Sequence, residues 1–275
     1  MKTSLESIAT AILKDGHPKL RDMDKPTVTI LTFCNDIDAL YGTLLVFKTL
    51  RVAFPTSRVV VFDNGSIDQA RPEIETAATA AQCEFRSMNR KPYWHHFEWL
   101  LFDQDEFQSV VIVDPDCIFW KSVEDWSFPG KVMAGRYIPN LAHLGCRTLE
   151  RLHPSLLFVP SIEAIRDVRR SNPGWGLIAP TQVGPVFADT FSILYGLTSQ
   201  NCHRFTSDQL DSYDHLFFGS HLRMVKPSFV GDVVKHAHEK ALRGDLHDIR
   251  GIYKEQDRLF GGSEPDPLAG QIFAR

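Results

Sequence analysis

The sequence has few cysteines, no long apolar run and no excess of basic residues, and each absence excludes a class of protein. Its five cysteines are scattered without Cys-x-x-Cys spacing, which argues against a zinc site or a disulfide framework and favours buried thiols in a reducing compartment. No apolar run approaches the roughly 20 residues needed to cross a bilayer, and the first residues, short in apolar content and partly acidic, make a poor signal peptide. A formal net charge of −4 gives no electrostatic reason to expect a nucleic-acid partner. We therefore expect a soluble, cytoplasmic protein.

The composition is that of an ordinary globular chain. Of the 275 residues, 43% are hydrophobic and 23% are charged, and the length suffices for one large α/β domain. In the first half, patterns typical of strands (27–34, 58–62, 83–86 and 109–113) alternate with patterns typical of helices (35–54, 72–81 and 94–101). Such alternation predicts parallel strands joined by right-handed crossovers, as in a Rossmann-like sheet.

The alternation weakens after residue 120. The patterns there indicate strands at 131–137, 156–160 and 222–226, and helices at 162–170 and 188–197. A Pro/Gly-rich loop over 171–185 is too long for a simple connection, and loops of this kind are often functional. We expect an N-terminal helix and connector over 1–26, a single α/β domain with a mixed, mostly parallel sheet over 27–235, and a C-terminal tail over 236–275.

Two carboxylates follow the most apolar strand. The run Val-Val-Ile-Val at 110–113 is followed directly by Asp114, Pro115 and Asp116. An unbroken apolar run suits a strand that is buried on both faces, and ligands of open α/β sheets bind beyond the carboxyl ends of the strands. Two adjacent carboxylates repel each other unless a cation lies between them, and a divalent metal that carries phosphates is a common solution. The alternative is a plain Asp-Pro turn.

The order of strand, helix, the segment VVVFDNGSID and a strand ending in Asp-Pro-Asp resembles the nucleotide-sugar glycosyltransferases of the GT-A fold. The Asp-Asn-Gly-Ser-x-Asp segment is most similar to that of family-two-like enzymes. The resemblance implies a GT-A-like domain with a nucleotide-binding half over 27–120, which it covers well, and an acceptor half over 121–235, which it covers loosely. It also implies a nucleoside diphosphate sugar as donor, Mn2+ or Mg2+ as cofactor, and a glycan, lipid-linked or small-molecule acceptor.

The resemblance assigns roles to residues of the first half. Asp63 would accept a hydrogen bond from the base, and Thr32 and Phe33 would line the same pocket. Asp114 would contact the ribose or the metal, and Asp116 would be the principal metal ligand. For Asp63 the alternative is a turn residue that bonds its own backbone.

In the second half the resemblance implies a general base and a further metal ligand. The acidic residues Asp208, Asp211 and Asp214 lie where the family places its base; we put Asp211 first and Asp214 second, with a solvated acidic helix face as the alternative. The Glu-Asp pair that is frequent in the family at this place is missing, so the base and the inverting outcome stay open. Imidazole is a good ligand of divalent metals, and we choose His236 over His238 for that role.

These expectations describe a metal-dependent transfer of a sugar to an acceptor hydroxyl, in which the metal offsets charge on the leaving diphosphate. Lys91 would approach the same diphosphate, unless it is simply part of a basic surface turn, and the loop over 171–185 would close over the donor. A sugar nucleotidyltransferase ranks lower, because residues 34–42 lack a Gly-rich, basic phosphate loop. A metal-dependent hydrolase and a nucleotide-sugar-binding protein without catalytic activity also stay open as functions of such a site.

Overall fold

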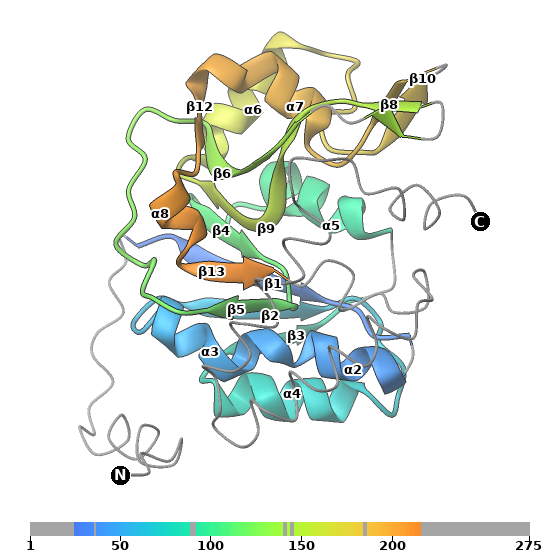
Figure 1. Ribbon diagram of the computed structural model, residues 1–275. Coiled ribbons are helices and arrows are strands. Elements are labelled where there is room, and N and C mark those ends of the chain that lie inside the picture. The colour runs from blue at the N-terminus through green and yellow to red at the C-terminus, as the bar shows by residue number, and fades with distance from the viewer. Residues whose placement is uncertain are drawn as a thin grey trace.

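The computed structural model describes residues 25–35, 37–88, 92–139, 142–143, 146–183 and 186–215 (Figure 1). Most of the expected N-terminal helix and connector, the strand expected at 222–226 and the whole C-terminal tail lie outside these residues. No helix in the described ranges is long and apolar enough to cross a membrane.

A seven-stranded sheet forms the centre of the molecule, with the strand order β12-β6-β9-β4-β1-β2-β3. Its strands are β1 (Thr27–Thr32), β2 (Val59–Asp63), β3 (Glu84–Ser87), β4 (Val110–Val113), β6 (Met133–Ile138), β9 (Arg151–Val159) and β12 (Cys202–Arg204). The pairs β4-β1, β1-β2, β2-β3 and β12-β6 are parallel, whereas β9 is antiparallel to both of its neighbours. The sheet is therefore mixed and mostly parallel, and the fold class expected from the sequence is confirmed.

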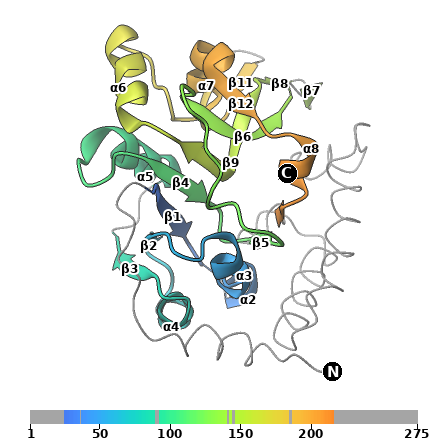
Figure 2. The same cartoon turned by 90° about the vertical axis from the view of Figure 1, so that its left-hand side faces the viewer.

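Helices cover both faces of this sheet (Figures 1 and 2). One face carries α2 (Ile37–Thr43), α3 (Leu45–Ala53) and α4 (Arg71–Ala80), and the other carries α5 (Tyr93–Glu98), the π-helical turn η1 (Trp99–Asp103), α6 (Ile162–Ser171) and α7 (Ser192–Thr198). Side chains alternate along each strand, so that Val111 and Val113 of β4 pack in the core under α3, and Val110 and Ile112 pack in the core under α5. Burial on both faces explains why this strand has no polar residue.

Smaller sheets complete the fold. The strand β5 (Cys117–Phe119) pairs antiparallel with β13 (Tyr213–His215), which follows the short helix α8 (Ser207–Leu210). A four-stranded sheet joins β10 (Thr181–Val183), β11 (Val186–Ala188), β8 (Cys146–Thr148) and β7 (Ala142–His143), and the 3-10 turn η2 (Ser199–Asn201) precedes β12. The pairing of β13 with β5 brings the last described residues back to the centre of the molecule.

Several boundaries differ from those expected. The helix expected over 35–54 is two helices, α2 and α3, and the strand expected at 156–160 begins already at Arg151. The loop expected over 171–185 contains β10, and the helix expected over 188–197 begins only at Ser192, because β11 extends through Ala188. These differences all lie where the pattern of apolar residues is broken by proline, glycine or polar residues.

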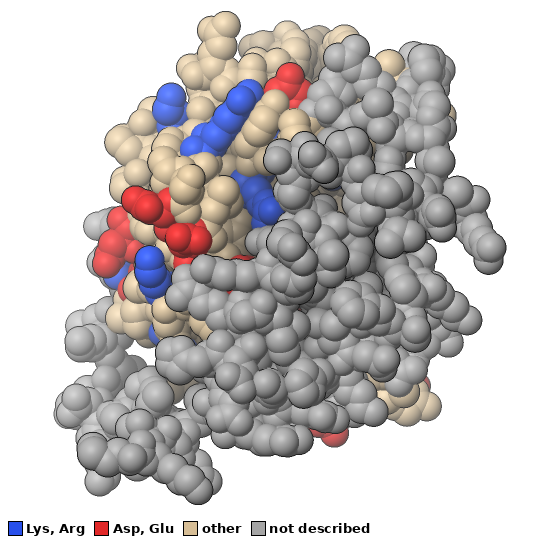
Figure 3. All heavy atoms as spheres, viewed as in Figure 1, with Lys and Arg blue, Asp and Glu red and all other residues tan. Residues whose placement is uncertain are grey.

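Charged side chains of both signs occur on one face of the described part of the chain. On the face shown in Figure 3, basic and acidic residues of the described chain are interspersed among uncharged ones rather than gathered by sign. Such a surface is typical of a protein with a small net charge.

Candidate metal centre

Asp114 and Asp116 lie at the carboxyl end of β4, which is the middle strand of the sheet. The turn that carries them is held by backbone hydrogen bonds: the Asp114 N–H donates to Ser155 O at 3.0 Å, and the Pro115 carbonyl accepts the Val46 N–H at 2.9 Å. The Asp116 side chain is 3% exposed, and the Asp114 side chain is 28% exposed. The two carboxylates therefore differ, because only Asp114 is partly exposed to solvent.

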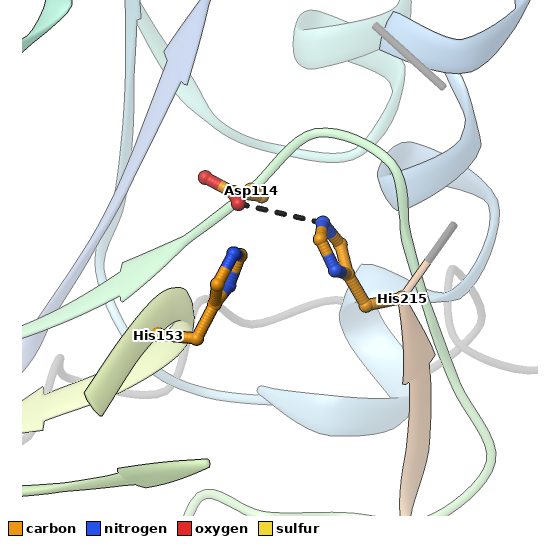
Figure 4. A group of neighbouring side chains, drawn as sticks. All are labelled: Asp114, His153 and His215. Atoms are coloured by element: carbon orange, nitrogen blue, oxygen red, sulfur yellow. Dashed lines mark ion pairs between the residues drawn. The ribbon is translucent and has the colours of Figure 1, made fainter. Parts of the chain in front are cut away.

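His215 completes this group. In the register of β13 with β5, His215 lies opposite Cys117, directly after the Asp-Pro-Asp turn. Its Nε2 atom is 3.1 Å from Asp116 Oδ1 and 3.5 Å from Asp114 Oδ2, and its side chain is 4% exposed. Figure 4 shows the imidazole pointing at Asp114. The sequence analysis missed His215 and chose His236, which lies outside the described residues, as does His238.

The electrostatics of the group favour a cation. Burial alone would lower the pKa of His215, but the charges of Asp116 and Asp114, and the hydrogen bonds to them, outweigh burial and raise this pKa to about 9. A proton is therefore held between the two carboxylates at neutral pH, in a place where a metal ion could replace it.

The distances also fit a divalent ion. Ligands of Mg2+ lie at about 2.1 Å in an octahedron, so neighbouring ligand atoms are about 3.0 Å apart. The 3.1 and 3.5 Å distances from His215 to the carboxylates are close to that spacing. Carboxylates suit Mn2+ and Mg2+, and imidazole suits transition metals, so the pairs His215–Asp116 and His215–Asp114 each fit the expected metal.

A second histidine lies beside this group. Asp114, His153 and His215 each have a possible ligand atom within 4.8 Å of those of the other two (Figure 4). The ring centroids of His153 and His215 are 5.0 Å apart. Desolvation and the neighbouring His215, Arg151 and Arg136 lower the pKa of His153 well below its usual range, so the ring is neutral. The sequence analysis missed this residue too.

Cys117 is close to the same carboxylates but is a poor ligand. Its Sγ atom lies within 4.8 Å of ligand atoms of Asp116 and His215, and its thiol donates to Ser155 O at 3.3 Å. Burial and the charges of Asp116 and Asp114 raise the pKa of the thiol well above its usual range. Because metals bind the thiolate, Cys117 serves as a buried hydrogen-bond donor, in agreement with the buried thiols expected from the sequence.

The residues expected to hold the base lie at the same edge of the sheet. Thr32 pairs with Asp63 at the ends of β1 and β2, next to β4. Asp63 is 0% exposed, and its carboxylate accepts hydrogen bonds from the Ser66 hydroxyl and, at 3.2 Å, from the Ser66 N–H. Arg71 Nε lies 3.4 Å from the same carboxylate. Asp63 thus orders its own turn, and its direct contact with a base stays a prediction.

The acidic residues expected to supply a base do not share one helix face. The helix α8 has only four residues, with Asp208 in its first turn and the exposed Asp211 directly after it. Asp214 is buried in β13, where its Oδ2 atom accepts a hydrogen bond from Trp120 Nε1 at 2.6 Å. Phe33 is partly buried after β1, and Lys91 lies outside the described residues.

A further polar group near Asp114 had no signal in the sequence. The Tyr93 hydroxyl is 2.6 Å from Thr190 Oγ1, and Arg151 is ion-paired with Asp189 at 2.9 Å. Burial and the charges of Asp189 and Asp114 raise the pKa of Tyr93. These residues come from α5, β9 and the turn before α7, and only the fold brings them together.

Neither a protein-family model nor a curated protein sequence matches the chain. Among solved structures, the apo bifunctional glycosyltransferase WbbM has a TM-score of 0.46 and 10% identity over 67% of this chain, which spans 39% of WbbM. The mannosyltransferase PcManGT from Pyrobaculum calidifontis, in complex with GDP-Man and Mn2+, has a TM-score of 0.42 and 14% identity over 96% of this chain and 84% of its own. The glycosyltransferase GlyE from Streptococcus pneumoniae TIGR4 has a TM-score of 0.43 and 12% identity over 88% of this chain and 65% of its own. At such low similarity the reaction has to be inferred from the chain's own site residues.

Proposed function

We propose that the protein is a metal-dependent glycosyltransferase, which moves a sugar from a nucleoside diphosphate sugar to an acceptor hydroxyl. The observation that carries the proposal is the convergence of Asp114, Asp116 and His215 at the carboxyl end of the central strand, with His215 Nε2 at 3.1 and 3.5 Å from the two carboxylates. Ligands of open α/β sheets bind at this end of the strands, and the Asp-Pro-Asp sequence resembles the metal motif of the GT-A enzymes.

The different exposure of the three side chains to solvent supports binding of a diphosphate. Asp116 and His215 are buried and would hold a metal ion from the protein side, whereas Asp114 is 28% exposed and within reach of a ligand from solvent. Ions such as Mg2+ are usually held by one or two carboxylates and complete their shell with water and substrate phosphates. A bound metal would offset the charge that develops on the leaving diphosphate.

The base of the donor would lie beyond the ends of β1 and β2. Thr32 and Asp63 are buried beneath that edge, and Phe33 is only partly buried on it. We therefore propose that the base lies against Phe33, with Asp63 holding the Ser66 turn beside it. Lys91, which lies outside the described residues, stays a candidate for approaching the diphosphate, with a basic surface turn as the alternative.

The acceptor proton needs a base within reach, and Asp211 and Asp214 stay our candidates. Asp214 is adjacent to His215 and is held by the Trp120 indole, whereas Asp211 is exposed to water. Changing each to asparagine and measuring transfer against pH would tell them apart, because loss of the base removes the acidic limb of the profile.

The proposal is tested by release of nucleoside diphosphate from a panel of nucleotide sugars, with Mn2+ and with or without simple glycoside acceptors. We expect release with one donor, and a loss of at least about a hundredfold in Asp116→Asn, which removes a charge that would face the metal. Asp125→Asn, whose side chain is 88% exposed, is the matched control and should keep full activity.

Full activity of Asp116→Asn in the presence of a chelator would contradict the metal assignment. Release that needs no acceptor would support a metal-dependent hydrolase. Donor binding without release would support a nucleotide-sugar-binding protein without catalytic activity.

A further inference from the structure

His153 is placed by an irregularity in the sheet. Where β9 passes β6, Gly135 pairs with Leu157 but the next residue, Arg136, pairs with His153. The residues between them on β9, which include Pro154 and Ser155, therefore bulge out of the ladder. Proline has no N–H to give to a ladder and is typical of such bulges, and bulges re-aim side chains next to active sites.

The bulge joins His153 to the turn that carries the carboxylates. The Ser155 carbonyl accepts hydrogen bonds from the Asp114 N–H at 3.0 Å and from the Cys117 thiol at 3.3 Å. The Ser155 N–H donates to His153 Nδ1 at 3.1 Å. The backbone C=O of Ser155 thus binds the Asp114 turn while its N–H binds the His153 ring, so Ser155 fixes the ring relative to Asp114.

This hydrogen bond determines which ring nitrogen carries the proton. A nitrogen that accepts an N–H uses its lone pair, so a neutral imidazole bonded in this way has its proton on Nε2. A metal ion bound at Nε2 would move the proton to Nδ1, where it would face the Ser155 N–H, and two donors would meet at 3.1 Å. The bulge therefore favours His153 as a donor at Nε2 and opposes its use as a metal ligand.

The position of His153 indicates what it would donate to. Of the four residues at the site, Asp116 and His215 are buried, and Asp114 and His153 are partly exposed. Figure 4 shows the His153 ring directed toward Asp114, on the side away from the backbone of β13. His153 therefore lies beside Asp114, the more exposed of the two carboxylates, where a ligand of the metal would approach.

We infer that His153 is not a metal ligand but a donor-binding residue, whose Nε2–H donates to an oxygen of the metal-bound nucleoside diphosphate sugar. The inference rests on the proposed function, since the accepting oxygen belongs to that substrate. It replaces a two-histidine metal site (Asp114, His153 and His215) with a site in which His215 binds the metal and His153 binds the substrate.

The test separates binding of metal from binding of substrate. Mn2+ alone is titrated into the wild type, His153→Phe, His153→Gln and His215→Gln, and free Mn2+ is followed by electron paramagnetic resonance. We expect both His153 variants to bind Mn2+ within about threefold of the wild type, and His215→Gln to lose tenfold or more. The same proteins, saturated with Mn2+, are then titrated with UDP-glucose, GDP-mannose and inorganic pyrophosphate.

In this second step His153→Phe should lose about tenfold in affinity for the donor that the wild type binds, as expected for one hydrogen bond to a charged or strongly polar oxygen. His153→Gln should retain most of the affinity, because its amide can accept from Ser155 and still donate to the ligand. A loss shared with pyrophosphate would assign the oxygen to the diphosphate, and a loss confined to the nucleotide sugar would assign it to the sugar.

The inference is overturned if His153→Phe weakens the binding of Mn2+ alone as much as His215→Gln does, or if it leaves all affinities unchanged. Wild-type protein that binds no Mn2+ would instead overturn the proposed function, and this inference with it. Circular dichroism of each variant checks that the fold is intact.

Discussion

Replacing His96 with phenylalanine should make the protein less sensitive to acid. His96 lies in α5 and is 3% exposed. The centroid of its ring lies 4.8 Å from that of the Phe62 ring and 5.7 Å from that of the Trp99 ring. Burial lowers the pKa of His96 from 6.5 to about 3. In the folded protein the ring is therefore neutral over the whole range in which the protein would be handled.

The sign of the effect follows from the depressed pKa. Below pH 6.5 the unfolded chain takes up a proton that the folded protein does not, so protonation favours unfolding and the free energy of unfolding decreases as the pH falls toward 3. The slope is about 1.4 kcal/mol per pH unit for one proton, which amounts to about 2 kcal/mol between pH 6.5 and 5. Above pH 7 His96 makes no pH-dependent contribution.

Urea unfolding at pH 7.5 and pH 5 measures this difference. The wild type should lose about 2 kcal/mol more than His96→Phe between the two pH values. If the free energies of unfolding of the wild type and His96→Phe differ by the same amount at both pH values, the difference reflects packing alone. Phe97→Leu changes a neighbouring buried ring without a titratable group, so its cost should be the same at both pH values. If the wild type and His96→Phe lose stability in parallel, His96 is not the acid-sensitive group.

Three further predictions concern the site and its supports. Mn2+ affinity should rise about tenfold from pH 7 to pH 8, because the pKa of His215 is raised to about 9 and its proton must leave before metal binds; equal affinities at the two pH values would contradict this. Gly135→Ala should destabilise the protein by about 1–3 kcal/mol, since its Cβ would lie 3.0 Å from a buried leucine. Gly196→Ala in α7, where nothing lies within 4 Å, should be neutral or stabilising, and equal urea midpoints for the two variants would refute the packing argument. Trp120→Phe removes the hydrogen bond to Asp214 and should cost about 1.5–3 kcal/mol; a double-mutant cycle with Asp214→Asn that gives no coupling would show that the bond contributes nothing.

The first half of the fold was predictable because its strands are buried on both faces. In β2, Val59 and Val61 pack in one core and Val60 and Phe62 in the other, so the strand appears in the sequence as an unbroken apolar run. The same holds for β4, which is why the position of Asp114 at its end could be predicted. A run this short, made mostly of β-branched residues and followed by turn residues, favours a strand over a buried helix.

The second half was harder to predict because its strands are irregular. Pro154 lies inside β9, and a proline normally argues against a strand unless a bulge is present. The bulge becomes visible only in the pairing of β9 with β6, in which Gly135 and Arg136 face residues on either side of it. The expected strand therefore began after the proline and missed His153.

The sequence predicted the two carboxylates of the candidate site but not its histidine. Asp114 and Asp116 follow directly from their place after β4, but His215 reaches them through the pairing of β13 with β5, which joins segments far apart in the chain. Nothing in the local sequence of His215 indicates that pairing, and the acidic residues before it suggested a helix face. Tertiary contacts of this kind do not have a local pattern.

The most direct test of the central claim is calorimetric titration of UDP and GDP into the protein, with Mn2+ and with a chelator. A metal held by Asp116 and His215 predicts that one diphosphate binds, that binding needs Mn2+, and that Asp116→Asn and His215→Gln abolish it while Asp125→Asn does not. Binding that is equal in the chelator, or the binding of neither diphosphate by protein that is folded, would contradict the account.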